Sequence, residues 1–308
     1  MPHASAPGKI ILFGEHAVVY GRPALAVPVM QVHADADVSD APRAGIWIHA
    51  PDISLHAELS SLPSDHPIAA VIHNFFFAFG VSPFPSLDIS ITSTIPVASG
   101  LGSGAAVTVA LLRALSSAVH RPLSNEQINQ FTYEIEKLHH GTPSGIDNTV
   151  ITYARPVYFI KGQPIETFNV GAPFTLVIAD TGIFAPTKES VGDVRKLWVS
   201  DKPRWESVFD EIGGIANRAR DCIERGKKKE LGSLMWDNHA LLQQLTVSSP
   251  ELDRLVESAR RAGASGAKLS GGGRGGNMIA LVEKDRAAQV SEALLSAGAK
   301  RTIVTEIA

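Results

Sequence analysis

The sequence contains a single cysteine, Cys222, so no internal disulfide can form. A lone thiol is typical of proteins from a reducing compartment. No apolar run reaches the eighteen or so residues that a transmembrane helix needs, and the first residues lack the apolar core of a signal peptide. Like charges form no block, and the net charge is only -3, which argues against nucleic acid or a membrane surface as a partner. We therefore expect a cytoplasmic protein, more typical of an enzyme than of a structural module.

Several familiar nucleotide-binding signatures are also missing. The P-loop pattern G-x-x-x-x-G-K-[ST] does not occur, and neither does the protein-kinase set of glycine loop, H-R-D and D-F-G. KLSGGGRGGN (268–277) matches G-x-G-x-x-G, but a predicted strand follows it where a dinucleotide-binding fold requires a helix. We interpret this glycine run as a backbone turn packed against an active site.

The composition is that of an ordinary globular protein, with 308 residues, 44% hydrophobic and 19% charged. Length alone fits one large domain or two of ordinary size. Apolar runs and alternating apolar residues predict strands in the first hundred residues, and helical spacing predicts helices further on. The strands are expected at 9–13, 23–29, 32–38, 46–48, 87–91 and 157–161, and the helices at 67–80, from 105 to 119 and from 124 to 141. In the last of these helices, Ser124 and Gln127 predict a capping box and Gly141 predicts the end. Its expected buried stripe consists of Ile128, Phe131, Ile135 and Leu138.

The pattern changes beyond about residue 165. Strands are expected at 174–180, 277–283 and 301–307, with helical patterns across 205–215, 231–242, 252–259 and 285–297. This order predicts an α+β fold whose second half contains a split βαβ sheet. A stretch with glycine and proline at 162–173 is the expected boundary, which gives domains at 1–165 and 166–308.

The stretch IPVASGLGSGAAVTVALLRAL (95–115) places three glycines and several small side chains directly before an apolar helix. A helix N-terminus has unpaired N–H groups and a partial positive charge. A loop without large side chains lets those donors approach phosphate oxygens, and Ser103 adds a hydroxyl that could bind a metal ion or the phosphate. The alternative is a tight turn that serves only close helix packing. We favour phosphate binding.

EKLHHGTPSGIDN (136–148) carries two separated carboxylates, Glu136 near the end of a predicted helix and Asp147 on a predicted loop. One carboxylate could hold a cation while the other accepts a proton. Taken singly, Glu136 is better explained as a solvated helix carboxylate, and Asp147 as a cap of the next segment. His139 and His140 are adjacent, so their side chains diverge, and we interpret both as local structure.

APGKIILFGEHAVVYGRPA (6–24) places Lys9 at the start of a predicted strand and Glu15–His16 after a turn at Gly14. A lysine at a strand start is usually solvated. A Glu–His pair between apolar stretches is less ordinary, because polar groups there need partners.

Together these four stretches resemble the GHMP kinase superfamily. The lysine strand, the P-x-x-x-G-L-G-S loop, the P-S-G-x-D turn and the late K-L-S-G-G-G run follow the family's order. APGKIILFGEHAVVYG is most similar to the mevalonate kinases within the superfamily. The resemblance runs from about residue 6 to residue 283, with little motif content in 30–85 and 196–262.

The resemblance implies an N-terminal, ribosomal-S5-like ATP-binding domain and a C-terminal, ferredoxin-like domain. It implies transfer of phosphate from ATP, with Mg²⁺, to the C5 hydroxyl of mevalonate as part of isoprenoid biosynthesis. Asp147 would accept the hydroxyl proton, and Lys9 would lie near Asp147 and the γ-phosphate. Glu15, His16 and Thr187 would contact the substrate, and Ser103 and Glu136 would hold Mg²⁺. The nucleotide would be held by Pro96, Ala98, Ser99, Gly100, Leu101, Gly102, Ser103, Gly104 and Ala105.

Two positions depart from the family pattern. Gly104 stands where a second serine is common. Ser103 is then the only hydroxyl at the start of the helix that follows the glycines, and the identity of the metal ligand stays open. Arg274 interrupts the late glycine run. It could reach phosphate, pair with an acid or point to solvent, and we expect solvent.

The motifs leave alternative functions open. Phosphomevalonate kinase, mevalonate 3-kinase, homoserine kinase and diphosphomevalonate decarboxylase belong to the same superfamily. A non-catalytic ligand-binding paralogue is the alternative from another class, although Lys9, Glu136 and Asp147 together argue against it. The small-molecule substrate is the only partner that the motifs imply, and a homodimer is left open.

Overall fold

A computed structural model describes residues 1–96, 99–140 and 144–308. The chain forms two compact units, each built from several stretches of sequence. Unit 1 comprises residues 1–8, 32–97 and 101–154, and unit 2 comprises 9–31, 98–100 and 155–308. The predicted boundary near residue 165 divides the sequence once, into two continuous domains. It stays a prediction, because it describes sequence domains rather than these discontinuous units.

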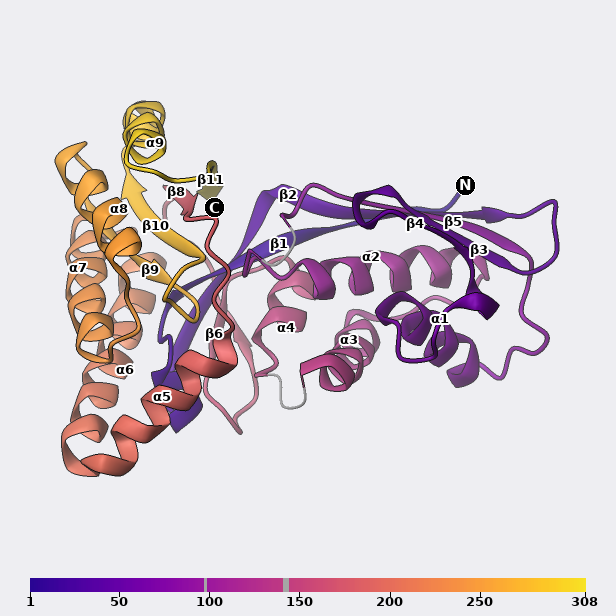
Figure 1. Cartoon of the computed structure of the whole chain (residues 1–308), viewed down its shortest axis with the longest axis horizontal. Coiled ribbons are helices and arrows are strands. Elements are labelled where there is room, and N and C mark those ends of the chain that lie inside the picture. Colours follow the sequence, from indigo (N-terminus) through magenta and orange to yellow (C-terminus); the bar gives the residue numbers. More distant parts are fainter. Residues whose placement is uncertain (97–98, 141–143) are drawn as a thin grey trace. The chain divides into compact units, whose positions relative to one another are not determined.

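Unit 1 is a sheet with helices on one face (Figure 1). The long strands β1 (His3–Phe13) and β2 (Ala24–Asp40) have residues in both units. The sheet order is β4-β3-β5-β2, with β1 paired to β2, and β3 is parallel to β5. The remaining elements are β3 (Ile46–Ala50), β4 (Leu55–Glu58), β5 (Leu87–Ser93), α1 (Pro67–Ala78), α2 (Ser103–Ala118), α3 (Asn125–His140), α4 (Ile146–Tyr153) and the short 3₁₀ turns Pro51–Ile53 and Leu59–Ser61.

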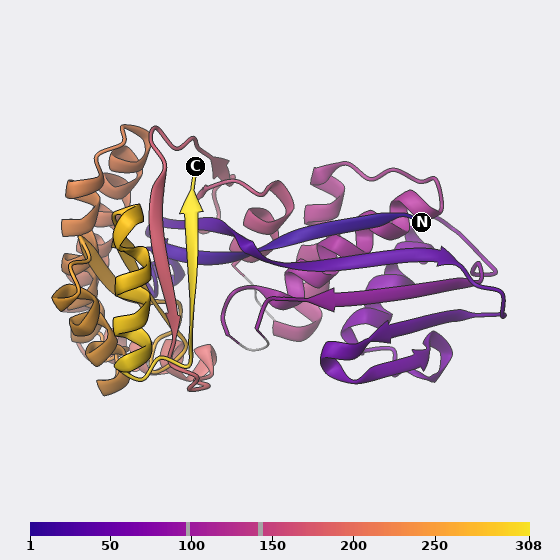
Figure 2. The same ribbon diagram turned by 90° about the horizontal axis from the view of Figure 1, so that it is seen from above.

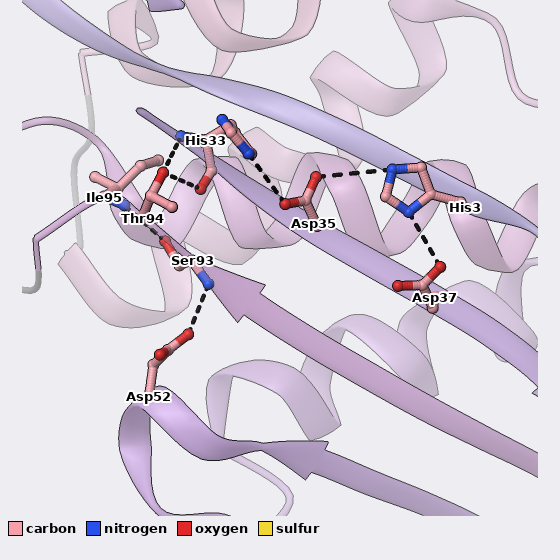
Figure 3. Close-up of polar contacts among 8 residues, drawn as sticks. All are labelled: His3, His33, Asp35, Asp37, Asp52, Ser93, Thr94 and Ile95. Carbon is pink, nitrogen blue, oxygen red and sulfur yellow. Dashed lines mark hydrogen bonds and ion pairs between the residues drawn. The ribbon is translucent and has the colours of Figure 1, made fainter. Parts of the chain in front are cut away.

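The alternation along β2 explains why the helices cover one face of this sheet. Val32, Ala34, Ala36 and Val38 are buried, since successive side chains point to opposite faces and this set faces the helices. The intervening polar residues lie on the other face. They form a network in which His3 Nδ1 lies 3.0 Å from Asp37 and His33 Nε2 lies 3.2 Å from Asp35 (Figure 3). These polar side chains pair with one another on a solvated surface.

Unit 2 contains an antiparallel sheet of order β11-β8-β10-β9. This is the split βαβ arrangement, as predicted, and Figure 2 shows β8 beside β11. Helices α7, α8 and α9 pack on the sheet. The elements are β6 (Val157–Phe159), β7 (Glu166–Thr167), β8 (Phe174–Asp180), α5 (Thr187–Ser200), α6 (Lys202–Glu224), α7 (Lys228–Gln244), α8 (Pro250–Arg261), β9 (Gly266–Ser270), β10 (Asn277–Val282), α9 (Ala287–Ser296), β11 (Arg301–Ile307) and the 3₁₀ turns Ala17–Tyr20 and Lys284–Arg286.

The structure confirms most predicted elements and corrects three details. β1 begins at His3, so Lys9 lies within a strand and is buried, and not at a solvated strand start. Leu138, assigned to the buried stripe of α3, is 62% exposed. Asp147 lies in the first turn of a helix, α4, and not on a loop. The predicted stop at Gly141 falls outside the described residues.

No helix in the described part of the chain is both long and apolar enough to cross a membrane.

The capping box predicted at the start of α3 is present. Gln127 N–H donates to Ser124 Oγ over 3.3 Å, and Ser124 N–H donates to Gln127 Oε1 over 2.9 Å. Each bond satisfies a backbone donor that would otherwise lack a partner at the helix end.

We expect Ser124→Ala to lower the free energy of unfolding by about 1 kcal/mol, because one of these donors loses its acceptor. Urea denaturation followed by circular dichroism measures the change. Ser117→Ala, at an exposed position on α2, is the matched control and should not destabilise. Equal destabilisation by both variants would contradict the capping role.

Candidate functional site

The predicted site residues are divided between the two units. Unit 1 contains the start of α2 and the carboxylates Glu136 and Asp147, whereas unit 2 contains Lys9, Glu15, His16 and Thr187. Ser99 and Gly100 belong to unit 2, Pro96 belongs to unit 1, and Ala98 lies outside the described residues.

The glycine stretch leads into a helix N-terminus, as its sequence predicts. Gly100 and Gly102 have φ angles of 76° and 77°, a conformation that residues with a Cβ adopt only at a cost. Gly102 is the N-cap of α2 and supplies no capping side chain. The N–H groups of Ser103, Gly104 and Ala105 therefore lack the intrahelical acceptors that later residues have. An anion held there would receive several N–H bonds and the favourable end of the helix dipole.

Two glycines show which groups border this helix start. A Cβ added at Gly8 of β1 would lie 3.0 Å from Val32 Cγ2 and 3.2 Å from the Leu101 carbonyl oxygen. A Cβ added at Gly104 would lie 3.5 Å from Glu136 Oε1. Glu136, on α3, therefore places its carboxylate beside the first turn of α2.

The residues present fit a magnesium ion. The Ser103 hydroxyl at the start of α2 and the neighbouring Glu136 carboxylate from α3 are the hard oxygens that Mg²⁺ prefers as ligands. Among the described residues, no three His, Cys, Asp or Glu side chains gather as a cage of protein ligands. This donor set suits Mg²⁺, which keeps several waters and binds through one or two protein groups together with substrate phosphates.

Asp147 is held in place by its neighbours on α4. Asn148 Nδ2 donates to Asn129 Oδ1 on α3 over 2.6 Å, and Thr149 Oγ1 donates to the Gly145 carbonyl over 2.7 Å. Both anchoring side chains are buried, whereas Asp147 is only half-buried. The helix start that carries the Asp147 carboxylate is therefore anchored by buried hydrogen bonds on its next two residues.

In unit 2, Glu15 and His16 are buried on a tightly constrained turn. Gly14 has φ 92°, and a Cβ there would lie 2.4 Å from the Pro23 carbonyl oxygen. His16 itself has φ 61°, and its Nε2 lies 3.1 Å from the Gly272 carbonyl oxygen. Because a carbonyl can only accept, Nε2 carries the proton.

Thr187 lies near the same carbonyl. It is the first residue of α5 and is exposed, and a Cβ added at Gly272 would lie 2.9 Å from its Oγ1. The structure thus brings His16 and Thr187, which are far apart in sequence, to one residue of the β9–β10 loop.

The start of the glycine stretch is also fixed within unit 2. The Asn277 side-chain amide, at the end of the same β9–β10 loop, donates to the Ser99 carbonyl. Lys9 is 6% exposed, so its ammonium is largely withdrawn from solvent. The late glycine run therefore contacts both His16 and Ser99 within this unit.

The expectation that Arg274 points to solvent is wrong. Its Nη1 donates to Asp193 Oδ2 over 2.6 Å, so it pairs with an acid on α5. Hydrogen bonds from Lys196 and then Arg274 lower the pKa of Asp193 to about 2.

Sequence reasoning missed two buried residues. Lys268, within the fully buried strand β9, donates to Glu15 Oε1, and its side chain is 0% exposed. His239, on α7, accepts from Leu269 N–H at Nδ1 over 3.4 Å and faces Asp253 through Nε2 at 3.2 Å. The signal for Lys268 was present as a charge inside an otherwise apolar strand, which requires a partner.

Burial dominates the titration of these groups. It lowers the pKa of His16 to about 4, against the raising effect of the Gly272 bond. It also lowers the pKa of His239 to about 4, although Asp253 raises it. Burial lowers the pKa of Lys268, and Glu15 opposes that shift. Both histidines are therefore neutral at pH 7.

Two family models and several known proteins are similar to this chain. Residues 66–155 match the family model described as GHMP kinases N terminal domain, and residues 219–300 match GHMP kinases C terminal. Mevalonate kinase from Pyrococcus horikoshii is 37% identical, covering 96% of this chain and 92% of the relative. Mevalonate kinase from Saccharolobus solfataricus is 33% identical, with 91% and 90% covered.

Solved structures agree with those relatives. The crystal structure of L. major mevalonate kinase in complex with R-mevalonate has a TM-score of 0.87 at 28% identity, covering 100% of this chain and 96% of that one. A Streptococcus pneumoniae phosphomevalonate kinase has a TM-score of 0.83 at 16% identity, which shows the shared fold alone.

The two neutral histidines give the protein a defined pH dependence. Unfolded histidine binds a proton near pH 6.5, whereas His16 and His239 bind one only near pH 4 when folded. Between these values the unfolded state holds more protons, so stability is complete above about pH 6.5 and falls as the pH drops. His239→Gln should weaken this decline in the melting temperature, measured from pH 7.5 to 4.5. His120→Asn, at an exposed position, should leave it unchanged. The same pH dependence in His239→Gln as in the wild type would contradict the assignment.

Proposed function

This chain belongs to the mevalonate kinases of the GHMP kinase superfamily, and from that membership we propose that it transfers the γ-phosphoryl group of ATP to the C5 hydroxyl of mevalonate. The observation that carries the proposal is the 37% identity to a mevalonate kinase across 96% of the chain. The product would be 5-phosphomevalonate, an intermediate of isoprenoid biosynthesis.

The α2 N-terminus supports the ATP-binding part of the proposal. Phosphoryl transfer depends mainly on positioning and on neutralising charge. The N–H groups of Ser103, Gly104 and Ala105 would hold phosphate oxygens, together with the loop residues from Pro96 to Gly102. Ser103 and Glu136 would hold Mg²⁺, which neutralises charge on the phosphates when bound.

Asp147 is proposed as the group that accepts the proton of the C5 hydroxyl. A carboxylate within hydrogen-bond reach suffices, because a primary alcohol loses its proton late in the reaction. Its half-buried position on an anchored helix start fits that role. Lys9 would offset negative charge on the transferring group.

Glu15, His16 and Thr187 are proposed to bind the substrate. Glu15 and His16 are buried, and His16 and Thr187 approach the same glycine, Gly272. A branched hydroxy acid carries several polar groups that such a polar surface could bind.

A direct assay tests the reaction. The purified protein is incubated with ATP, MgCl₂ and (R)-mevalonate, and ADP formation is coupled to NADH oxidation. Phosphorus and carbon NMR then identify the modified hydroxyl. Phosphate on C5 supports the proposal. Phosphate on C3, or a higher kcat/KM for phosphomevalonate or homoserine, would overturn it.

Asp147→Ala should lower kcat by about a thousandfold or more, since it removes both the base and its orientation of the hydroxyl. Binding of ATP, measured by calorimetry, should change little. Asp147→Asn separates the two effects, because the amide keeps the shape without the basicity. Turnover near that of the wild type in either variant would refute the assignment of the base.

Glu136→Gln should raise the concentration of Mg²⁺ needed for half-maximal activity about tenfold, because the amide is a weaker ligand for a hard cation. Glu134→Gln is the matched control on the same helix, where Glu134 pairs with two exposed side chains, Lys137 at 2.9 Å and Gln130 at 3.0 Å. An identical magnesium titration for Glu136→Gln and the wild type would rule out the ligand role.

A further inference from the structure

Lys268 forms a buried ion pair with Glu15. A contribution to stability is a poor explanation for this pair. Its ammonium donates to Glu15 Oε1 and to the Leu269 carbonyl, the latter over 2.7 Å. The two charged side chains are 0% and 1% exposed. Removing both charges from water costs about as much as their attraction returns, so such a pair is weak evidence for stability. A role in the site is the better explanation.

The β9–β10 hairpin holds Glu15 and His16 together. Lys268, on β9, binds the Glu15 side chain, and the carbonyl of Gly272, four residues later, accepts from His16 Nε2. The backbone of this turn is fixed independently by Gly14, which leaves no room for a Cβ. The constrained backbone at Gly14 and the hydrogen bonds from the hairpin therefore both restrict the positions of the Glu15 and His16 side chains.

This arrangement leaves two hydrogen-bond acceptors unsatisfied. Glu15 Oε2 and His16 Nδ1 are buried and have no hydrogen-bond partner within the described part of the chain. With the proton on Nε2 and the ring neutral, His16 Nδ1 can only accept, as can a carboxylate oxygen. Buried acceptors without donors are costly. A hydroxyl has one hydrogen, which either acceptor can take or both can share, whereas a carboxylate has none.

We propose that Lys268 is a positioning residue, which holds the Glu15 carboxylate so that Glu15 Oε2 and His16 Nδ1 form an acceptor pair for the non-reacting C3 hydroxyl of the substrate. This inference rests on the proposed function, because mevalonate supplies that hydroxyl. It assigns the substrate carboxylate to other groups, since two acceptors would repel it.

Kinetics of charge-removing variants test the positioning role. Lys268→Met should raise KM for mevalonate at least tenfold while KM for ATP stays within twofold. Glu15→Gln should show the same pattern. Lys284→Met is the control, because Lys284 forms an exposed ion pair with Glu306 at 2.9 Å and should leave both constants unchanged.

The single variant at Lys268 leaves a buried, unpaired Glu15 and could fail to fold. The double variant Lys268→Met/Glu15→Gln removes both charges and should fold, with its KM for mevalonate still raised at least tenfold. A mevalonate KM within twofold of the wild type in both Glu15→Gln and the double variant would overturn the proposal.

Substrate analogues test which group the pair receives. The wild type should prefer mevalonate over 5-hydroxy-3-methylpentanoate, which lacks the C3 hydroxyl, and this preference should shrink at least fivefold in Glu15→Gln and in the double variant. The preference over mevalonamide, which lacks the carboxylate, should change less than twofold. The opposite result, with only the second preference reduced, would assign the pair to the carboxylate and refute the proposal.

A measurement without turnover separates this inference from the proposed function. In ¹⁵N-histidine-labelled protein, long-range NMR correlations should show His16 as the neutral Nε2–H form at pH 7, identified by its absence in His16→Asn. A protonated ring or an Nδ1–H form would refute the acceptor pair. If His16 has the expected form and mevalonate is not phosphorylated by the wild type, the proposed function fails while the acceptor pair stands.

Discussion

The contact between Glu15 and Lys268 joins residues 253 positions apart, and the organisation of unit 2 depends on such contacts. Ser270 Oγ donates to the Ile11 carbonyl over 2.7 Å along the same segment. Further on, Arg22 pairs with Asp210 at 2.9 Å. The stretch 9–31 therefore folds with residues 155–308, although it begins the chain. Glu15 and His16, near the N-terminus, are thus held by the β9–β10 hairpin of residues 266–282.

Periodicity predicted most of the fold because it depends only on neighbouring residues. The fully apolar β8, the alternating β2 and the capping box of α3 all follow from local sequence. Local sequence did not reveal α4, since its eight residues, which follow the letters Pro-Ser-Gly, carry too little helical pattern. Leu138 continues the apolar spacing of α3 yet is 62% exposed, because it lies in the last turn of that helix.

The parts of the candidate site that could be predicted are those whose residues lie close together in the sequence. The glycines before α2, with Glu15 and His16 after Gly14, are visible in sequence, and resemblance to a family connected them. Lys268 was not identified as a candidate site residue, although it is the first residue of the late glycine run at 268–277. Its role depends on Glu15, and no local pattern shows which charge is buried against which. Pairing over long sequence distances therefore limits what a single sequence reveals about a site.

The β9–β10 loop shows why Arg274 can interrupt a glycine run. A Cβ at Gly273 would lie 1.9 Å from the Val247 carbonyl oxygen, and one at Gly275 would lie 2.5 Å from the Ile183 carbonyl oxygen, so these two positions admit only glycine. Arg274, between them, has φ 60°, which costs a residue with a Cβ about 1 to 2 kcal/mol. Its N–H donates to the Val247 carbonyl over 2.8 Å and its guanidinium pairs with Asp193, which offsets that strain. The loop thus keeps its backbone, and with it the carbonyl of Gly272 that fixes His16.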